Sequence, residues 1–252
     1  MTRPDGLKTP RETLAGLLPA AIFWSVLAFF IFRYLIVQII GLHAMVSEDG
    51  ARSFWAFFLD NDHPGRMAMT GFMELAIGLL CFEHLRRNSV EDCVLQPGRF
   101  GMLSIYLASF ATLVAPELIY NSVVMVSQFI GSEPPKLTNN DASGLFPPHQ
   151  LLGLFLTVII IAPVIEEFLF RGFLMTSMEA RGWSNWIVVG ASSACFALLH
   201  IGYTGFGMLM LFVLGCMLGV MRIWSGGIVL PIIAHAAFNM KSFLFSYFNA
   251  YG

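Results

Sequence analysis

Charged side chains are scarce in this sequence, and their scarcity excludes an ordinary soluble domain. Asp, Glu, Lys and Arg together make up 12% of the 252 residues, whereas soluble domains carry roughly 25%. Hydrophobic residues make up 57% of the chain, and the mean hydropathy is +0.72. Combined with long apolar runs, this composition is typical of an integral membrane protein, so we expect the lipid bilayer to be its surroundings.

Other features that the sequence lacks exclude further classes. The net charge is −2 and no basic tract is present, so we expect no nucleic-acid partner. No internal repeat is found, which argues against a transporter built from two related halves. The four cysteines show no zinc-ligand spacing, and most fall inside apolar segments, so we interpret them as packing residues rather than as a disulfide framework. They are Cys81, Cys93, Cys195 and Cys216.

Long apolar runs are what the sequence does have, and they predict an all-α, polytopic transmembrane helical bundle. A spanning helix needs about 20 mostly apolar residues, and seven stretches reach or approach that length. The third contains Pro116, which can kink or split a helix, so eight spans is the alternative. The stretches are Leu17–Ile40, Met67–Leu85, Phe100–Ile130, Leu151–Met175, Asn185–His200, Phe206–Ile223 and Gly227–Phe248.

The basic residues alternate between the two sides of this arrangement. Arg and Lys precede the first span and recur between the second and third, fourth and fifth, and sixth and seventh. By the positive-inside rule, the N-terminus is cytoplasmic and the C-terminus lies outside. The first apolar run is too long for a signal peptide, so we expect it to be retained. The polar, Pro-rich residues 131–150 then form an external loop, and we expect a bacterial plasma membrane.

Ionisable residues within the predicted spans are the functional candidates, because each costs about 2.5–3.5 kcal/mol to insert into a bilayer. Three of them are scattered through the N-terminal half, one per span: Arg33, Glu74 and Glu117. We interpret these as interhelical ion pairs or as side chains that reach the interface. The alternative is a polar patch that docks a substrate.

A second group of ionisable residues is dense and lies in the last 90 residues. Glu166 and Glu167 are adjacent in the fourth span, and Arg171 follows four residues after Glu167. Residues four apart share a helix face, so Glu167 and Arg171 can pair. Glu166 is rotated by about 100° from Glu167 and should point at something else. Arg171 would neutralise Glu167 and fix the helix.

The remaining members of this group lie in two other spans. His200 ends the fifth span, and the seventh span carries His235 and Asn239 on one helix face. In a straight antiparallel hairpin, His200 falls at about the same depth as Glu166. A carboxylate in an apolar pocket suits a general base, so we expect Glu166 and His200 to activate a water molecule. His235 and Asn239 offer two donors for an oxyanion. These roles predict peptide-bond hydrolysis.

The same side chains leave a metal site open as an alternative. Two histidines, a glutamate and an asparagine include groups that zinc accepts. The sequence has no H-E-x-x-H motif, however, and asparagine is a poor zinc ligand. We therefore favour a mechanism without a cofactor, with a zinc-dependent protease as the alternative.

At these residues the sequence resembles the CPBP group of intramembrane endopeptidases, which includes the type II prenyl-protein (CAAX) proteases and bacterial relatives. That group carries three motifs, Glu-Glu-x-x-x-Arg, Phe-x-x-x-His and His-x-x-x-Asn or Asp, and this sequence has all three in order. The resemblance covers about Leu151 to Ser246. The motifs are Glu166-Glu167-Phe-Leu-Phe-Arg171, Phe196-Ala-Leu-Leu-His200 and His235-Ala-Ala-Phe-Asn239.

The resemblance implies a helical membrane fold with its site inside the membrane, and it supports the roles given above. Residues 151–248 would form the catalytic helices, and residues 1–150 form further transmembrane helices without a match. The substrate would be a membrane-associated protein or peptide, whether lipidated or not. Two other functions stay open: a non-catalytic immunity or scaffold protein that keeps the fold, and an ion- or proton-coupled transporter.

Overall fold

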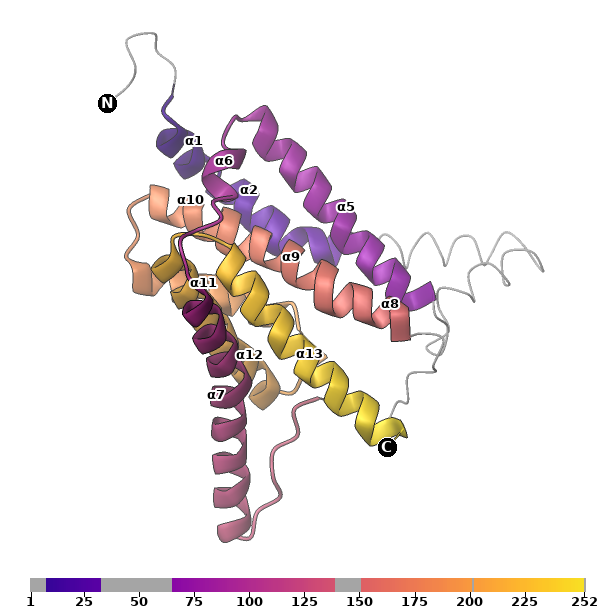
Figure 1. Cartoon of the computed structure of the whole chain (residues 1–252). Helices are drawn as coiled ribbons and strands as arrows, with labels where there is room; N and C mark the ends of the chain where they lie inside the picture. Colours follow the sequence, from indigo (N-terminus) through magenta and orange to yellow (C-terminus); the bar gives the residue numbers. More distant parts are fainter. Residues whose placement is uncertain (1–7, 33–64, 139–150, 201, 252) are drawn as a thin grey trace, which may run out of the picture.

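The computed structural model of the chain describes residues 8–32, 65–138, 151–200 and 202–251 (Figure 1). Within these ranges the protein is helical, and the only strand-like pairing there is an isolated bridge between Thr138 and Tyr203. The predicted all-α class is therefore confirmed. The end of the first predicted span, with Arg33, and most of the predicted external loop lie outside the described residues.

The N-terminal part of the described chain consists of several short helices and one long helix, α5. Helix α1 (Pro10–Gly16) begins at Thr9, whose side chain forms a capping box with Glu12. The chain then bends by 57° into a helical stretch, Leu18–Phe32. Further along, α5 runs over 23 residues before the short α6. These elements are α2 (Leu18–Ile22), the π-helix η1 (Phe23–Leu27), α5 (Gly65–Arg87) and α6 (Glu91–Val94).

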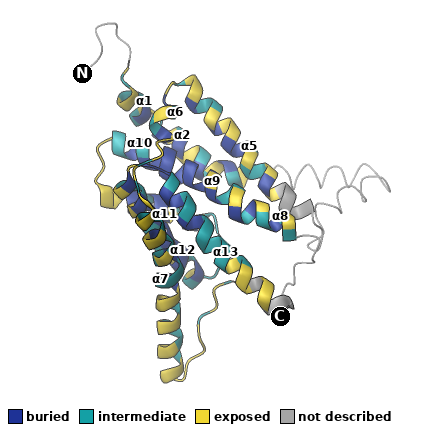
Figure 2. Cartoon of the chain, viewed as in Figure 1, coloured by how far each residue is buried: buried dark blue, intermediate teal, exposed yellow. Residues whose placement is uncertain are grey.

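Helix α7 (Met102–Phe129) is continuous over 28 residues although Pro116 lies inside it, so the third predicted stretch is one helix. Its upper half is fixed to the C-terminal helix, because the Thr112 hydroxyl donates to the Ala234 carbonyl at 3.2 Å. Its lower half diverges from the other helices and is largely exposed (Figures 1 and 2). An exposed apolar surface of this kind suits contact with lipid.

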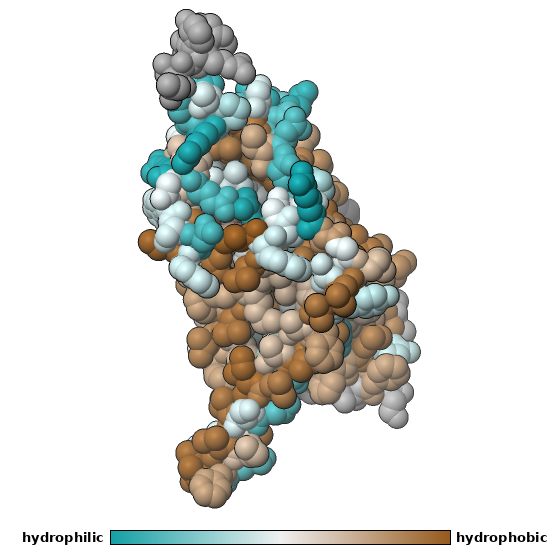
Figure 3. Space-filling model, turned by 60° about the vertical axis from the view of Figure 1, so that its left-hand side comes forward, coloured by the Kyte–Doolittle hydropathy of each residue, from teal (hydrophilic) through white to brown (hydrophobic). Residues whose placement is uncertain are grey.

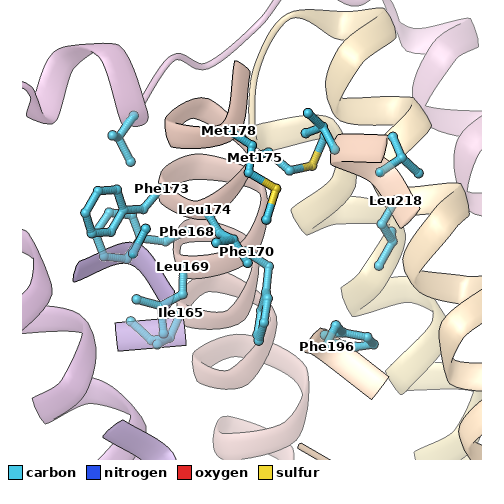
Figure 4. Close-up of a cluster of buried hydrophobic side chains, with 14 of the residues drawn as sticks. Ile165, Phe168, Leu169, Phe170, Phe173, Leu174, Met175, Met178, Phe196 and Leu218 are labelled. Atoms are coloured by element: carbon cyan, nitrogen blue, oxygen red, sulfur yellow. The ribbon is translucent and has the colours of Figure 1, made fainter. Parts of the chain in front are cut away.

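The centre of the fold is one long helical stretch, Leu151–Ala180, that alternates between α- and π-helical turns. Its buried side chains contact neighbours on opposite sides: Figure 4 shows Phe168, Leu169 and Phe173 on one side, and Phe196 and Leu218 from other helices across from it. π-helical turns within α-helices occur frequently at functional sites. The successive parts are α8 (Leu151–Phe155), η3 (Leu156–Ile161), α9 (Ala162–Glu167), η4 (Phe168–Leu174) and α10 (Met175–Ala180).

Three further helices complete the bundle. Small residues let α12 approach α11: a Cβ added at Gly215 would lie 3.0 Å from the Ser193 Cβ, and one at Gly219 would lie 3.2 Å from Val189. Glycines four apart are a common means of close packing between membrane helices. The helices are α11 (Asn185–Leu198), α12 (Gly205–Ser225) and α13 (Val229–Tyr251).

The described residues contain three helices that are long and apolar enough to cross a membrane, or four if the bent N-terminal pair is one span. The three are α7, the Leu151–Ala180 stretch and α12. The predicted total of seven or eight is not confirmed. Helix α11 shows one reason, because its 14 residues extend only about 21 Å, against a hydrocarbon core of about 30 Å.

Polar side chains gather at the end of the molecule where α1, α6 and α10 lie (Figures 1 and 3). Arginines join the elements there: Arg11 donates to the Ala180 carbonyl at 3.3 Å, and Arg181 donates to the Ala15 carbonyl at 2.7 Å. Arg222 also pairs with Glu179 at 2.6 Å. Loops that the sequence assigns to one side of the membrane therefore meet at one end of the structure.

Candidate active site

The centre of the candidate site is the Glu167 carboxylate, which is completely buried. Its Oε1 accepts a hydrogen bond from Arg171 Nη1 at 3.1 Å, as expected for residues one helical turn apart. The same oxygen lies 2.9 Å from His235 Nδ1. Glu167 therefore connects the central helix to α13 as well as to its own arginine. The spacing along the helix predicts the first contact, whereas the second depends on how two distant helices pack.

Arg171 is also completely buried, and its guanidinium contacts groups from the surrounding helices. Its Nη2 donates to the Gly215 carbonyl of α12 at 3.0 Å. The guanidinium carbon lies 4.8 Å from the centre of the Phe196 ring, which is a cation–π contact. The Gly215 carbonyl is a partner that the sequence analysis missed. The sequence feature that points to this contact is the pair of glycines four apart in α12, which allows that helix to pack closely against its neighbours.

Phe196 connects the two histidines. Its ring centre lies 5.0 Å from that of His200 and 5.7 Å from that of His235. It also meets Phe170 edge to face at 5.6 Å. The first residue of the Phe-x-x-x-His motif is therefore a buried ring that contacts both histidines and the Arg171 guanidinium.

Glu166 points away from the Glu167–Arg171 pair, as its rotation on the helix requires. Its Oε2 lies 3.8 Å from His235 Nε2, and the residue is 8% exposed while Glu167 is 0% exposed. His235 thus lies between the two glutamates, with one ring nitrogen toward each. Glu166 is the carboxylate of the pair without an arginine partner among the described residues, and a weakly bound carboxylate is available to act as a base.

His200 follows the end of α11 and is partly buried. Its Nδ1 lies 3.0 Å from the Phe196 carbonyl one turn earlier, which leaves Nε2 for another partner. The Ser192 hydroxyl donates to the Phe170 carbonyl at 3.2 Å, so α11 is fixed beside the central helix. Because Ser192 is level with Phe170, His200 lies further along α11, toward the level of Glu166.

Asn239 lies one turn after His235 on α13, and its amide nitrogen donates to the Val158 carbonyl in η3 at 2.8 Å. The second amide hydrogen and the carbonyl oxygen of the side chain are left for other partners. The structure therefore brings Glu166, Glu167, Arg171, Phe196 and His235 into direct contact. His200 joins this group through its contact with the Phe196 ring, and Asn239 is held beside it by the Val158 carbonyl.

Two polar atoms inside this group have no hydrogen-bond partner among the described residues, namely Glu167 Oε2 and Arg171 Nε. Unsatisfied buried polar atoms are rare and are often explained by a functional role or a bound water. No three His, Cys, Asp or Glu side chains in the described part of the chain are arranged to hold a metal ion.

Comparison with known proteins places this site within a known family region. Residues 148–241 match the model of the type II CAAX prenyl endopeptidase Rce1-like family, so the resemblance found in the sequence is confirmed. An uncharacterised 24.3 kDa protein of Escherichia coli is 36% identical over 100 residues. That match covers 39% of this chain and 46% of the relative, so it spans about half of the relative's length. No solved structure matches the chain.

Proposed function

We propose that this integral membrane protein is an intramembrane endopeptidase that hydrolyses a peptide bond of a membrane-associated protein or peptide. The observation that carries the proposal is the buried group formed by Glu166, Glu167, Arg171 and His235. Three of these residues are at most 3% exposed, and the fourth is 8% exposed. Placing so many ionisable groups inside an apolar bundle costs free energy, so their presence indicates a function. The family match over residues 148–241 supports peptide hydrolysis as that function.

In this proposal Glu166 acts as the general base. It removes a proton from a water molecule, which His200 helps to orient, while the water oxygen attacks the carbonyl carbon of the substrate. The proton then passes from Glu166 to the leaving nitrogen as the carbon–nitrogen bond breaks.

His235 has to carry two protons to stabilise an oxyanion. Its Nδ1 is engaged by Glu167, so a proton on that nitrogen donates to the carboxylate. Its Nε2 can donate only if it holds a second proton. The imidazolium would balance the charge of Glu166, just as Arg171 balances that of Glu167. Asn239 supplies the second donor for the oxyanion, while its bond to the Val158 carbonyl fixes the amide.

No step in this mechanism passes through a metal. Zinc sites in enzymes use three protein ligands that converge on one point, and the described residues do not contain such a set. Asn239 contributes an amide that already donates to a carbonyl. A zinc-dependent protease is the alternative, and the experiment below tests it directly.

We also propose that the polar end joined by Arg11, Arg181 and Arg222 faces the cytoplasm. These residues lie in loops that the positive-inside rule assigns to that side, and the structure joins them at one end. A bacterial plasma membrane is the proposed location, with support from the Escherichia coli relative.

The test compares two glutamate variants of the full-length protein. Peptide products are identified by mass spectrometry in membranes of the host that express either wild-type protein or Glu166→Gln, and cleavage of each candidate is repeated with purified protein in detergent. We expect Glu166→Gln to lose about 10²–10⁴-fold in rate. The matched control is Glu117→Gln, because Glu117 is a half-exposed carboxylate that pairs with Lys241 and takes no part in the buried group. Full activity in Glu166→Gln would refute the proposed site.

Metal content is measured on the same preparations. We expect activity to survive chelation. Stoichiometric zinc, with activity lost on chelation and restored by zinc, would overturn the metal-free mechanism and leave the site assignment in place.

A further inference from the structure

Glu74 is a carboxyl that the mechanism above does not use. It lies on α5, outside the residues that the family model matches. Its Oε2 is buried and has no hydrogen-bond partner among the described residues. Leaving a carboxyl oxygen unsatisfied in an apolar bundle is costly, especially when the group is charged. This side chain therefore calls for a physical explanation.

The packing of α5 fixes where Glu74 lies. A Cβ added at Gly71 would be 2.6 Å from Thr157 Oγ1, and one added at Gly78 would be 2.5 Å from Ile165 Cδ1. Gly71 and Gly78 are two helical turns apart, and Glu74 lies between them on the same face. Glu74 therefore faces the central helix along the stretch that leads from Thr157 to Ile165, immediately before Glu166.

Helix α5 packs against α9, which carries Glu166, so the two carboxyls are near enough to repel each other when both are charged. In the described part of the chain, no other charged group on the helices that pack against α5 is available to pair with Glu74. Glu167 is bound to both Arg171 and His235, and α8 and η3 carry no charged side chain. The charged residues on elements that pack against α5 are Glu166 and Glu167 of α9, Arg171 of η4, and Glu91 and Asp92 of α6, which follow the far end of α5.

We propose that Glu74 and Glu166 form a carboxyl pair that shares one proton, so that Glu74 is a positioning residue that acts through the catalytic base. Two nearby carboxyls in an apolar site do not both ionise readily, and they titrate as a unit. With the proton on Glu74, Glu166 carries the one negative charge of the pair and is ready to accept a proton from water. A neutral Glu74 also explains how an unsatisfied carboxyl is tolerated inside the bundle.

The first test does not depend on proteolytic activity. A protonated carboxyl has an infrared C=O stretch that is distinct from the bands of a carboxylate, and it is recorded over a pH series on the full-length protein in liposomes. We expect a band at neutral pH in the wild type that Glu74→Gln abolishes. The matched control is Glu83→Gln on the same helix, because Glu83 is partly exposed and paired with Arg86 and Arg87; this variant should keep the band.

A second variant tests whether the proton is shared. Removing the charge of Glu166 with Glu166→Gln should make Glu74 lose its proton at a lower pH than in the wild type, because the like charge that favours protonation is gone. This titration stays decisive if Glu74→Gln fails to fold. A band that survives in a folded Glu74→Gln variant, or one that titrates identically in Glu166→Gln, would overturn the carboxyl pair.

The pH dependence of cleavage is the second readout, and it alone rests on the proposed function. In the wild type, the rate should change at alkaline pH as the pair loses its shared proton and Glu166 gains a charged neighbour. In Glu74→Gln this change should be absent or move to higher pH by about one unit or more, since position 74 can no longer ionise. A change in rate without this shift would mean a purely structural role. If no cleavage is found, the proposed function fails while the infrared result still decides the pairing.

Discussion

His235 Nδ1 lies 2.9 Å from the Glu167 oxygen that also accepts a hydrogen bond from Arg171. One carboxylate oxygen thus holds an imidazole from α13 and a guanidinium from its own helix. The orientation of His235, and hence the position of its Nε2 beside Glu166, depends on Glu167. Glu167 therefore has a larger role than neutralising an arginine, because it fixes a proposed oxyanion donor.

Removing Arg171 should destabilise the protein. In Arg171→Ala the Glu167 carboxylate stays buried without its cationic partner, and such a loss typically costs about 3–5 kcal/mol of unfolding free energy. The double variant Glu167→Gln with Arg171→Met should recover part of this, since neither charge is then buried. Thermal unfolding in detergent measures both variants. If the single variant melts like wild type, the pair does not contribute to stability as described.

Asn239→Ala should reduce catalysis more than stability. Loss of one oxyanion donor commonly lowers the rate by about 10²–10³-fold, whereas the variant removes one hydrogen bond from the fold, to the Val158 carbonyl. Ser242→Ala is the control on the same helix, because the Ser242 hydroxyl donates only locally, to the Phe238 carbonyl. Rates of peptide cleavage and melting temperatures are compared. An Asn239→Ala enzyme as fast as the control would remove Asn239 from the mechanism.

Two glycines at the start of α12 should respond differently to alanine. A Cβ at Gly207 would lie 2.0 Å from the Leu137 carbonyl oxygen, whereas one at Gly205 meets nothing within 4 Å. That carbonyl accepts from the Thr204 amide at 3.0 Å, close to His200 in the chain. We expect Gly207→Ala to cost about 1–3 kcal/mol through overpacking, and Gly205→Ala to be neutral or slightly stabilising. Equal melting temperatures would contradict this contact.

The C-terminus should lie outside the cytoplasm. Helix α13 begins near the arginine-rich end and runs away from it over 23 residues (Figure 1), which corresponds to about 34 Å. A reporter that is active only in the cytoplasm, fused after Gly252, should therefore be silent, and the same reporter placed before Thr9 should be active. A bright C-terminal fusion would reverse the proposed orientation or change the number of spans by one.

The sequence predicts those features that depend on neighbours within one helix. The Glu167–Arg171 contact follows from a spacing of four residues, and the structure contains it. The interpretation of Glu117 as part of an interhelical ion pair is also confirmed, but the sequence did not identify Lys241 of α13 as its partner. Both carboxylates have a basic partner, but the Glu167–Arg171 pair is fully buried whereas the Glu117–Lys241 pair is partly exposed.

Features that depend on packing between distant helices could not be predicted from the sequence. The contact between His235 and Glu167 joins residues 68 positions apart, and helical spacing says nothing about it. The position of Glu74 beside the central helix depends on the close approach at Gly71 and Gly78, and nothing in the sequence around these glycines identifies the helix that they contact. Pro116 allowed either one helix or two in the third stretch, and the structure shows one continuous α7.

The Ser25 hydroxyl is completely buried and donates to the Leu169 carbonyl in η4 at 3.1 Å, while Arg181 reaches back to the Ala15 carbonyl. The motif-bearing helices are thus completed by a part of the chain that carries none of the motifs. A truncated gene that encodes residues 148–241 alone would therefore leave the inner surface of the central helix uncovered. The motif-bearing segment does not form a separate unit, and chimaeras between relatives have to exchange the N-terminal helices together with it.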